Sequence, residues 1–132
     1  MWKRGKDARK KLTGIEAELL ARRHLKSQGL QIITNNYRCR RGEIDIICRD
    51  INSLVFIEVR CRSRTDFGSA AESVNYHKQK RLIYAAEHYL QKYPAMAQMS
   101  CRFDVICIEV DTSLPHKTPA YRVEWLTNAF SA

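Results

Sequence analysis

Two short segments of this chain carry acidic residues inside otherwise apolar strand patterns. Residues 42–48 (GEIDIIC) and 54–60 (LVFIEVR) are rich in β-branched and aromatic residues and are bounded by turn formers, so both are predicted to be β-strands. Because side chains alternate between the faces of a strand, Glu43 and Asp45 share one face, and Glu58 and Arg60 share one face of the next strand. An unpaired carboxylate in such surroundings is costly. A divalent cation flanked by basic residues would compensate for it.

The order of the remaining elements predicts an α/β architecture. A first helix is expected over residues 12–28, with its apolar stripe made by Leu12, Ile15, Leu19 and Leu20, and a second over about 74–93, ended by Pro94. Further strands are expected at residues 31–37, 102–110 and 121–126. The strand–helix–strand order indicates a parallel crossover. The chain is therefore predicted to form an αβββαβ mixed sheet flanked by helices, with a short extra C-terminal strand.

Composition narrows the class of protein. The 132 residues suit a single domain, and residues 1–11 resemble a flexible basic tail. A formal net charge of +9 favours an anionic partner, with nucleic acid ahead of an anionic membrane. No apolar run approaches the roughly 20 residues needed to span a bilayer, and no signal peptide is evident, so a cytoplasmic location is expected. The five cysteines and four histidines lack the spacing of metal ligands.

Asp45 and Glu58 are the candidate metal ligands. Mg²⁺ takes oxygen ligands and keeps several waters, so two protein carboxylates can suffice for it. A metal held in this way can assist phosphodiester cleavage, and Arg60, on the same face as Glu58, could stabilise the negatively charged transition state. The competing interpretation is an ordinary acid–base pair within a sheet.

Several short motifs, taken in order, resemble the YraN family of bacterial proteins. These are Glu16-Ala17, Asn36-Tyr37-Arg38, Gly42-Glu43-Ile44-Asp45, residues 55–62 (VFIEVRCR), Lys78-Gln79, residues 102–105 (RFDV) and Val123-Glu124-Trp125. That family is grouped with the PD-(D/E)xK nucleases and is similar to archaeal Holliday junction resolvases. The resemblance implies a restriction-endonuclease-like core and a Mg²⁺- or Mn²⁺-dependent endonuclease acting on DNA.

The resemblance also implies roles for individual residues. Asp45 and Glu58 match the metal-binding acids, and Glu16 matches a glutamate on the first helix that assists them. Arg60 stands where a lysine is expected, and since arginine stays protonated it cannot act as a general base. Glu16 has a second interpretation, because Thr13 and Glu16 have the spacing of a capping box.

Basic residues near these motifs are candidates for binding nucleic acid. They are Arg40, Arg41, Arg62, Lys78, Lys80 and Arg81. Lys78, Lys80 and Arg81 fall in the first turns of the second predicted helix, and the N-terminus of a helix favours a bound phosphate. Lys78 could partly replace the expected lysine. A solvated basic surface is the alternative for these three residues, and also for Arg40 and Arg41 in the expected hairpin turn.

Two other acids are expected to be structural. Glu43 is interpreted as a solvated or arginine-paired strand residue, and Asp104 as a buried carboxylate held by an arginine or a backbone amide. The aromatic residues near the C-terminus are expected to pack the end of the sheet or to form a dimer surface; these are Tyr121, Trp125 and Phe130.

Three functional hypotheses follow. The first is a metal-dependent endonuclease that hydrolyses DNA, with branched or structured DNA as one option for its substrate. The second is a nucleic-acid-binding module that has the nuclease fold but cleaves weakly or not at all, motivated by Arg60. The third is a subunit that binds an acidic protein. A homodimer is compatible with the first, because resolvase-like proteins use two sites for two strands.

Overall fold

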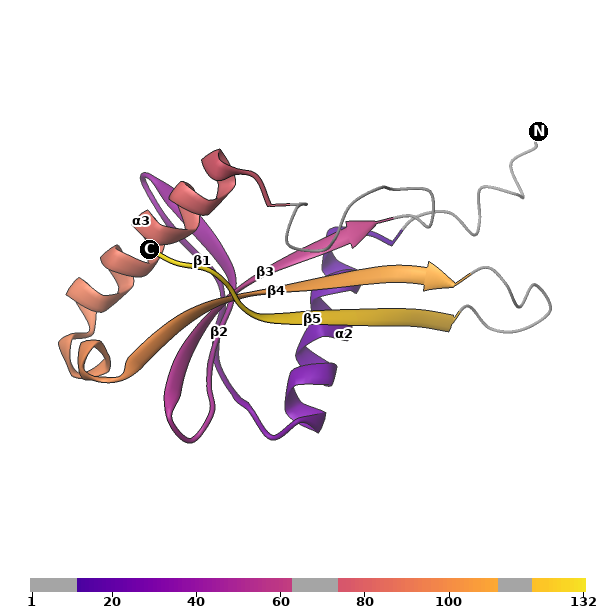
Figure 1. Ribbon diagram of the computed structural model, residues 1–132, viewed down its shortest axis with the longest axis horizontal. Coiled ribbons are helices and arrows are strands. Elements are labelled where there is room, and N and C mark those ends of the chain that lie inside the picture. Colours follow the sequence, from indigo (N-terminus) through magenta and orange to yellow (C-terminus); the bar gives the residue numbers. More distant parts are fainter. Residues whose placement is uncertain (1–11, 63–73, 112–119) are drawn as a thin grey trace.

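A computed structural model describes residues 12–62, 74–111 and 120–132 (Figure 1). The elements in chain order are α2 (Gly14–Ser27), β1 (Gln31–Cys39), β2 (Gly42–Arg49), β3 (Ser53–Arg62), α3 (Tyr76–Lys92), the short 3₁₀ helix η2 (Pro94–Gln98), β4 (Ser100–Asp111) and β5 (Ala120–Phe130). The expected basic tail, most of the expected loop after β3 and most of the polar segment before β5 lie outside the described residues.

The five strands form one mixed sheet in sequential order, β1-β2-β3-β4-β5. The β1–β2, β2–β3 and β4–β5 pairs are antiparallel, while β3 and β4 are parallel and are joined through α3. The expected α/β fold with a mixed sheet and a parallel crossover is therefore confirmed, and it is consistent with a restriction-endonuclease-like core. Helices α2 and α3 pack on opposite faces of the sheet, each over its own apolar cluster.

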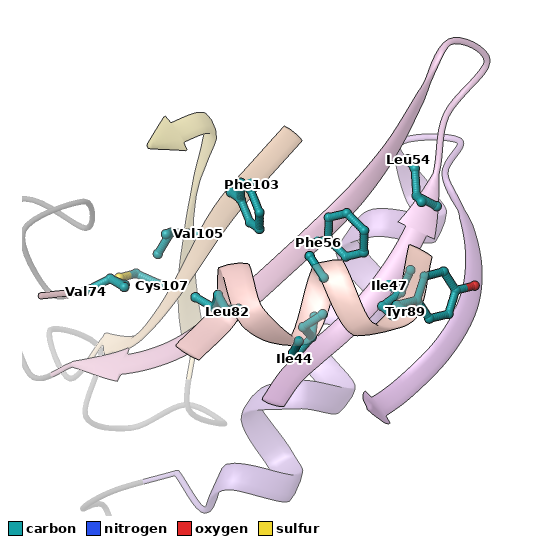
Figure 2. Packing of buried hydrophobic residues seen from close by; sticks show 12 residues of the cluster. Ile44, Ile47, Leu54, Phe56, Val74, Leu82, Tyr89, Phe103, Val105 and Cys107 are labelled. Carbon is teal, nitrogen blue, oxygen red and sulfur yellow. The ribbon is translucent and has the colours of Figure 1, made fainter. Parts of the chain in front are cut away.

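The cluster on the α3 face is built around aromatic side chains (Figure 2). Phe56 of β3 is in ring contact with Tyr89 of α3 and with Phe103 of β4, at centroid distances of 6.1 and 5.6 Å. Phe130 of β5 stacks on Phe103 at 5.0 Å, so the expectation that Phe130 packs the sheet end is confirmed. The aliphatic side chains of this cluster come from β2, β3, β4, α3 and Val74 just before α3, and they pack α3 against the sheet.

The buried face of α2 differs from the predicted one. Ala17, Ala21 and Leu25 are buried against the sheet, whereas Ile15 is 81% exposed and Leu19 is 39% exposed. The prediction followed the largest apolar side chains. Small alanines bring a helix close to a sheet, and here they select the contact face instead.

The C-terminal strand is longer than predicted. β5 runs from Ala120 to Phe130, and its register with β4 shifts between Phe103 and Val105. Asn128, in β5 opposite this region, has a left-handed φ of 53°. This irregularity explains why the predicted strand was too short, because a strand that changes register loses the simple alternation on which the prediction relied.

The expected structural role of Asp104 is confirmed. Its buried carboxylate accepts hydrogen bonds from Arg102 Nε at 3.1 Å, Trp125 Nε1 at 2.9 Å and the Asn128 backbone N–H at 2.8 Å. Arg102 Nη1 continues to Asp50 Oδ2 at 2.9 Å, in the turn between β2 and β3. This network ties β5 to the rest of the sheet and compensates for the buried charge.

Within the described ranges, no helix is both long enough and apolar enough to cross a membrane.

Candidate functional site

The candidate site lies where β2 and β3 separate. Their pairing extends from Arg49 and Leu54 to Ile46 and Ile57. Asp45 and Glu58 are the next residues beyond the last pair, one on each strand. Because β3 no longer pairs with β2 here, the Val59 backbone N–H is available on that side, and it donates to Asp45 Oδ2 at 2.8 Å.

The electrostatics show that the two carboxylates are neighbours. Burial, and after it the negative charge of Glu58, raise the pKa of Asp45 from 3.8 to about 7. The hydrogen bond from Val59 lowers this pKa, but by less, and a hydrogen bond shared with the Glu58 side chain raises it further. Two neighbouring carboxyl groups that are largely removed from solvent favour a proton or a cation between them. Sequence alternation alone placed each acid on its strand, and the antiparallel register of β2 and β3 places Asp45 opposite Glu58, one step beyond the last pair.

Glu58 is almost fully buried, with 5% of the residue exposed. Two cations approach the same oxygen: Arg60 Nη1 lies 3.6 Å and Lys78 Nζ lies 3.4 Å from Glu58 Oε2. The buried Nε of Arg60 is the one side-chain nitrogen or oxygen with no hydrogen-bond partner among the buried polar atoms of the described residues. Arg60 therefore contacts Glu58 through Nη1 and keeps one unused N–H donor at Nε.

Helix α3 is positioned so that its first turn reaches this site. The Asn75 side chain caps the helix by accepting a hydrogen bond from the Lys78 backbone N–H at 2.9 Å. Gly42, at the start of β2, lies so close to α3 that an added Cβ would be 1.8 Å from the Arg81 carbonyl oxygen. The absence of a side chain at Gly42 therefore allows the close approach that places Lys78 beside Glu58.

Of the two roles considered for Glu16, the structure supports capping. Thr13 Oγ1 accepts from the Glu16 backbone N–H at 3.1 Å, and Glu16 Oε1 accepts from the Thr13 backbone N–H at 2.9 Å. Both bonds of the capping box are thus present, on an exposed side chain.

Glu18 is the functional candidate that the sequence reasoning missed. Burial, and next the charge of Asp45, raise the pKa of Glu18, while a hydrogen bond from the Asn36 side chain lowers it. Glu18 therefore lies within electrostatic range of the acid pair. Its neighbour Ala17 and the next alanine, Ala21, mark the buried face of α2, and that spacing was the available signal.

The predicted basic residues divide between the β1–β2 turn, α3 and the end of β3. Arg40 is exposed in the turn, and the Arg41 guanidinium lies over the Tyr84 ring of α3 at 3.6 Å. Lys80 Nζ lies 5.5 Å from the Tyr76 ring centroid, and Arg81 is exposed. Arg62 is the last residue of β3. Lys78 contacts the acid pair directly, with its Nζ 3.4 Å from Glu58 Oε2.

Glu43 behaves as expected for a paired strand residue. Arg38 Nε lies 3.4 Å from Glu43 Oε1; the Arg38 side chain is exposed and that of Glu43 is half-buried. Glu43 contributes only a minor part of the upward shift in the pKa of Asp45.

The donor set fits a hard cation bound by few protein ligands. No group of three or more histidine, cysteine, aspartate or glutamate side chains that could hold a metal occurs within residues 12–62, 74–111 and 120–132. Asp45 and Glu58 nevertheless offer two adjacent carboxylates, and a Mg²⁺ or Mn²⁺ ion can complete its shell with water.

Comparison with known proteins gives the family. Residues 17–108 match the model of the Uncharacterised protein family UPF0102. The chain is 46% identical over 121 residues to a UPF0102 protein of Alcanivorax borkumensis, covering 92% of this chain and 93% of the relative. It is 44% identical over 119 residues to one of Saccharophagus degradans, covering 90% and 92%, respectively. The resemblance to the YraN family is thereby confirmed, since the two names denote one family. The chain belongs to family UPF0102.

Proposed function

We propose that this protein is a metal-dependent endonuclease that hydrolyses DNA phosphodiester bonds. Asp45 and Glu58 would hold Mg²⁺ or Mn²⁺ at the point where β2 and β3 separate. The observation that carries the proposal is the shared environment of these acids: burial and Glu58 together raise the pKa of Asp45 to about 7. Such a pair is destabilised when both acids are ionised, and a divalent cation relieves that repulsion.

The residues of the chain would divide the work as follows. A bound Mg²⁺ would supply positive charge at the phosphate and acidify a water ligand. Arg60 would donate its unpartnered Nε–H to the scissile phosphate, where negative charge increases in the transition state. Val59 would hold Asp45 in place through its backbone N–H. Hydrolysis adds water across one phosphorus–oxygen bond and leaves a phosphomonoester and a hydroxyl.

DNA is the proposed substrate because of charge. The chain has a net charge of +9, and exposed cations such as Arg40 and Arg81 flank the elements that carry the acids. Branched or structured DNA is the preferred form, by analogy with the resolvases that the sequence resembles. Two copies acting together would allow both strands to be cut.

The test is cleavage by highly purified protein. Labelled duplex, forked and four-way junction DNA should be cut with Mg²⁺ or Mn²⁺ and left intact with EDTA. Asp45→Asn and Glu58→Gln, which keep the shape of each side chain, should abolish cutting. Glu43→Gln is the matched control, because it removes a carboxylate from the same strand that pairs with Arg38 instead. Cutting that survives both Asp45→Asn and Glu58→Gln would belong to a contaminant and would refute the proposal.

A second candidate function is DNA binding with little or no cleavage. Its support is Arg60, whose guanidinium contacts Glu58 at 3.6 Å where the resemblance leads us to expect a lysine. Arg60→Lys separates the two candidates if the wild-type protein binds DNA but does not cut it. Cleavage by Arg60→Lys would identify a degenerate nuclease site, and continued inactivity would identify a binding module.

A further inference from the structure

We propose that Lys78 of α3 binds the scissile phosphate beside Arg60, so that the cationic part of the site comes from two elements rather than from β3 alone. The inference rests on the proposed nuclease function and assigns a positioning and charge-stabilising role within the same site. It starts from one fact of geometry: Lys78 Nζ and Arg60 Nη1 both face Glu58 Oε2, at 3.4 and 3.6 Å.

The ammonium of Lys78 is only loosely committed to Glu58. Charge-assisted N–H···O bonds are typically about 2.7–2.9 Å long, so 3.4 Å leaves the contact weak. The side chain is 39% exposed, whereas that of Glu58 is 7% exposed. An ammonium has three donors and needs only one for Glu58. Lys78 therefore contacts the buried acid and is itself accessible to a ligand from solvent.

The fold holds Lys78 in this place by several independent contacts. Its backbone N–H is fixed by Asn75 Oδ1, and the neighbouring Gln79 side chain donates to the Val74 carbonyl oxygen at 3.0 Å. Val74 and Leu82, on either side, are each 2% exposed and belong to the α3-face cluster (Figure 2). Lys78 is thus anchored within a rigid first turn.

The position is one that a helix does not favour for a cation. The N-terminal end of a helix attracts negative charge, and α3 has no acidic residue in its first turn. The 3.4 Å contact with Glu58 offsets only part of the cost of placing the Lys78 cation at the N-terminus of α3. A phosphate bound at Lys78 would satisfy the ammonium and the helix terminus together.

The experiment compares Lys78→Met with Lys92→Met, which removes the same charge from the last turn of the same helix. Single-turnover cleavage of labelled junction DNA with Mn²⁺ should fall about 100-fold in Lys78→Met, the size seen when one transition-state donor is removed. Lys92→Met should cut at the wild-type rate.

A second measurement separates a functional from a structural role. Isothermal titration of Mn²⁺ without DNA should show roughly fivefold tighter binding to Lys78→Met than to wild type, as expected when one positive charge about 4 Å from a ligand is removed. If Lys78 only built the site, the same substitution would weaken Mn²⁺ binding. Thermal unfolding verifies that the variant is folded, and Lys78→Gln repeats the test if it is not.

The outcomes are distinguishable. Wild-type protein that cuts no DNA refutes the proposed nuclease, and the Lys78 assignment with it. Wild-type protein that cuts, together with Lys78→Met cutting as fast as Lys92→Met, refutes the Lys78 assignment alone. Weaker Mn²⁺ binding by a folded Lys78→Met also refutes it.

Discussion

Asp45 accepts a hydrogen bond from a backbone amide and still has a strongly raised pKa. Such an amide bond ordinarily favours the ionised carboxylate. Here burial and Glu58 outweigh the bond from Val59 and raise the pKa of Asp45 to about 7. The protein therefore keeps a carboxyl group poorly stabilised in its ionised form, which is a cost that a bound cation would remove.

The free energy of unfolding of the metal-free protein should consequently depend on pH through the ionisation of Asp45. The pKa of Asp45 is 3.8 in the unfolded reference and about 7 in the folded chain, so the folded state binds the proton more tightly. The stability contributed by protonated Asp45 is complete below pH 3.8 and is lost as pH rises through about 7. In EDTA, the unfolding temperature of the wild type should fall across this window more steeply than that of Asp45→Asn.

Scanning calorimetry at a series of pH values provides the measurement. Mn²⁺ added above the folded pKa should return stability to the wild type but not to Asp45→Asn, because a cation replaces the missing proton. Parallel pH profiles for the two proteins would show that Asp45 is ionised without penalty.

Gly42 has no side chain at a point where β2 and α3 approach closely. A methyl group there would lie 1.8 Å from the backbone oxygen of Arg81, and backbone cannot rotate away as a side chain can. Gly42→Ala should therefore push α3 off the sheet and lower the free energy of unfolding by about 1–3 kcal/mol, as overpacking does.

Gly14→Ala is the matched control for this prediction. A Cβ at Gly14 meets nothing within 4 Å, and the residue begins α2. Alanine is a better helix former than glycine, so this change should be neutral or slightly stabilising. Equal denaturant midpoints for the two variants would mean that the helix adjusts freely, and that Gly42 does not set its position.

At the level of elements, the sequence predicted what each segment forms better than how the segments face one another. The strand pattern around Asp45 and Glu58 was sufficient for both strands, and the second helix was predicted within a few residues of its ends. The orientation of α2 was wrong because Ala17 and Ala21 carry little hydrophobic signal, although they make the contact. The same error hid Glu18, which lies next to that buried face.

Contacts that depend on three-dimensional arrangement could not be predicted. The pairing of β2 with β3 stops after Ile46 and Ile57, and nothing in the local pattern indicates where two strands part. The approach of Lys78 to Glu58 depends on Gly42, thirty-six residues earlier in the chain. Each relation arises from packing between distant segments.

The two helix caps offer a test at this scale. Thr13→Ala and Asn75→Ala each remove one side-chain cap, and each should lower the free energy of unfolding by about 1 kcal/mol. Only Asn75 holds the turn that carries Lys78. Cleavage should therefore fall clearly in Asn75→Ala and remain near wild type in Thr13→Ala, in a single-turnover assay at a temperature where both proteins are folded. An equal loss in both would indicate that general stability, rather than the α3 first turn, limits cleavage.

On the scale of the whole molecule, the sheet separates two regions. At one end, Asp50, Arg102 and Asp104 form a network in which each charge has a partner. At the other, Asp45 and Glu58 share an environment that raises the pKa of Asp45, and the Arg60 Nε–H has no partner among the described residues. Networks of the first kind maintain a fold, whereas an incompletely satisfied cluster is typical of a site that binds something.

The cationic surface should reveal its role through the salt dependence of DNA binding. Each phosphate contact contributes about 0.9 to the slope of log affinity against log salt concentration. Arg40 is exposed in the β1–β2 turn, and its neighbour Arg41 lies over the Tyr84 ring of α3, the helix that carries Lys78. Arg40→Ala should lower the slope by about 0.9 and weaken binding to all DNA sequences alike.

Lys26→Ala supplies the control for that measurement. Lys26 is exposed in the last turn of α2, and it carries the same charge at the end of the helix away from Glu18. Fluorescence anisotropy in Ca²⁺, which is used to prevent cutting, should give Lys26→Ala the slope of the wild type. If both substitutions reduced the slope equally, the charge of +9 would act as a diffuse field around the molecule. A reduction confined to Arg40→Ala would instead place the DNA along the β1–β2 turn and α3, the two elements that lead to Glu58.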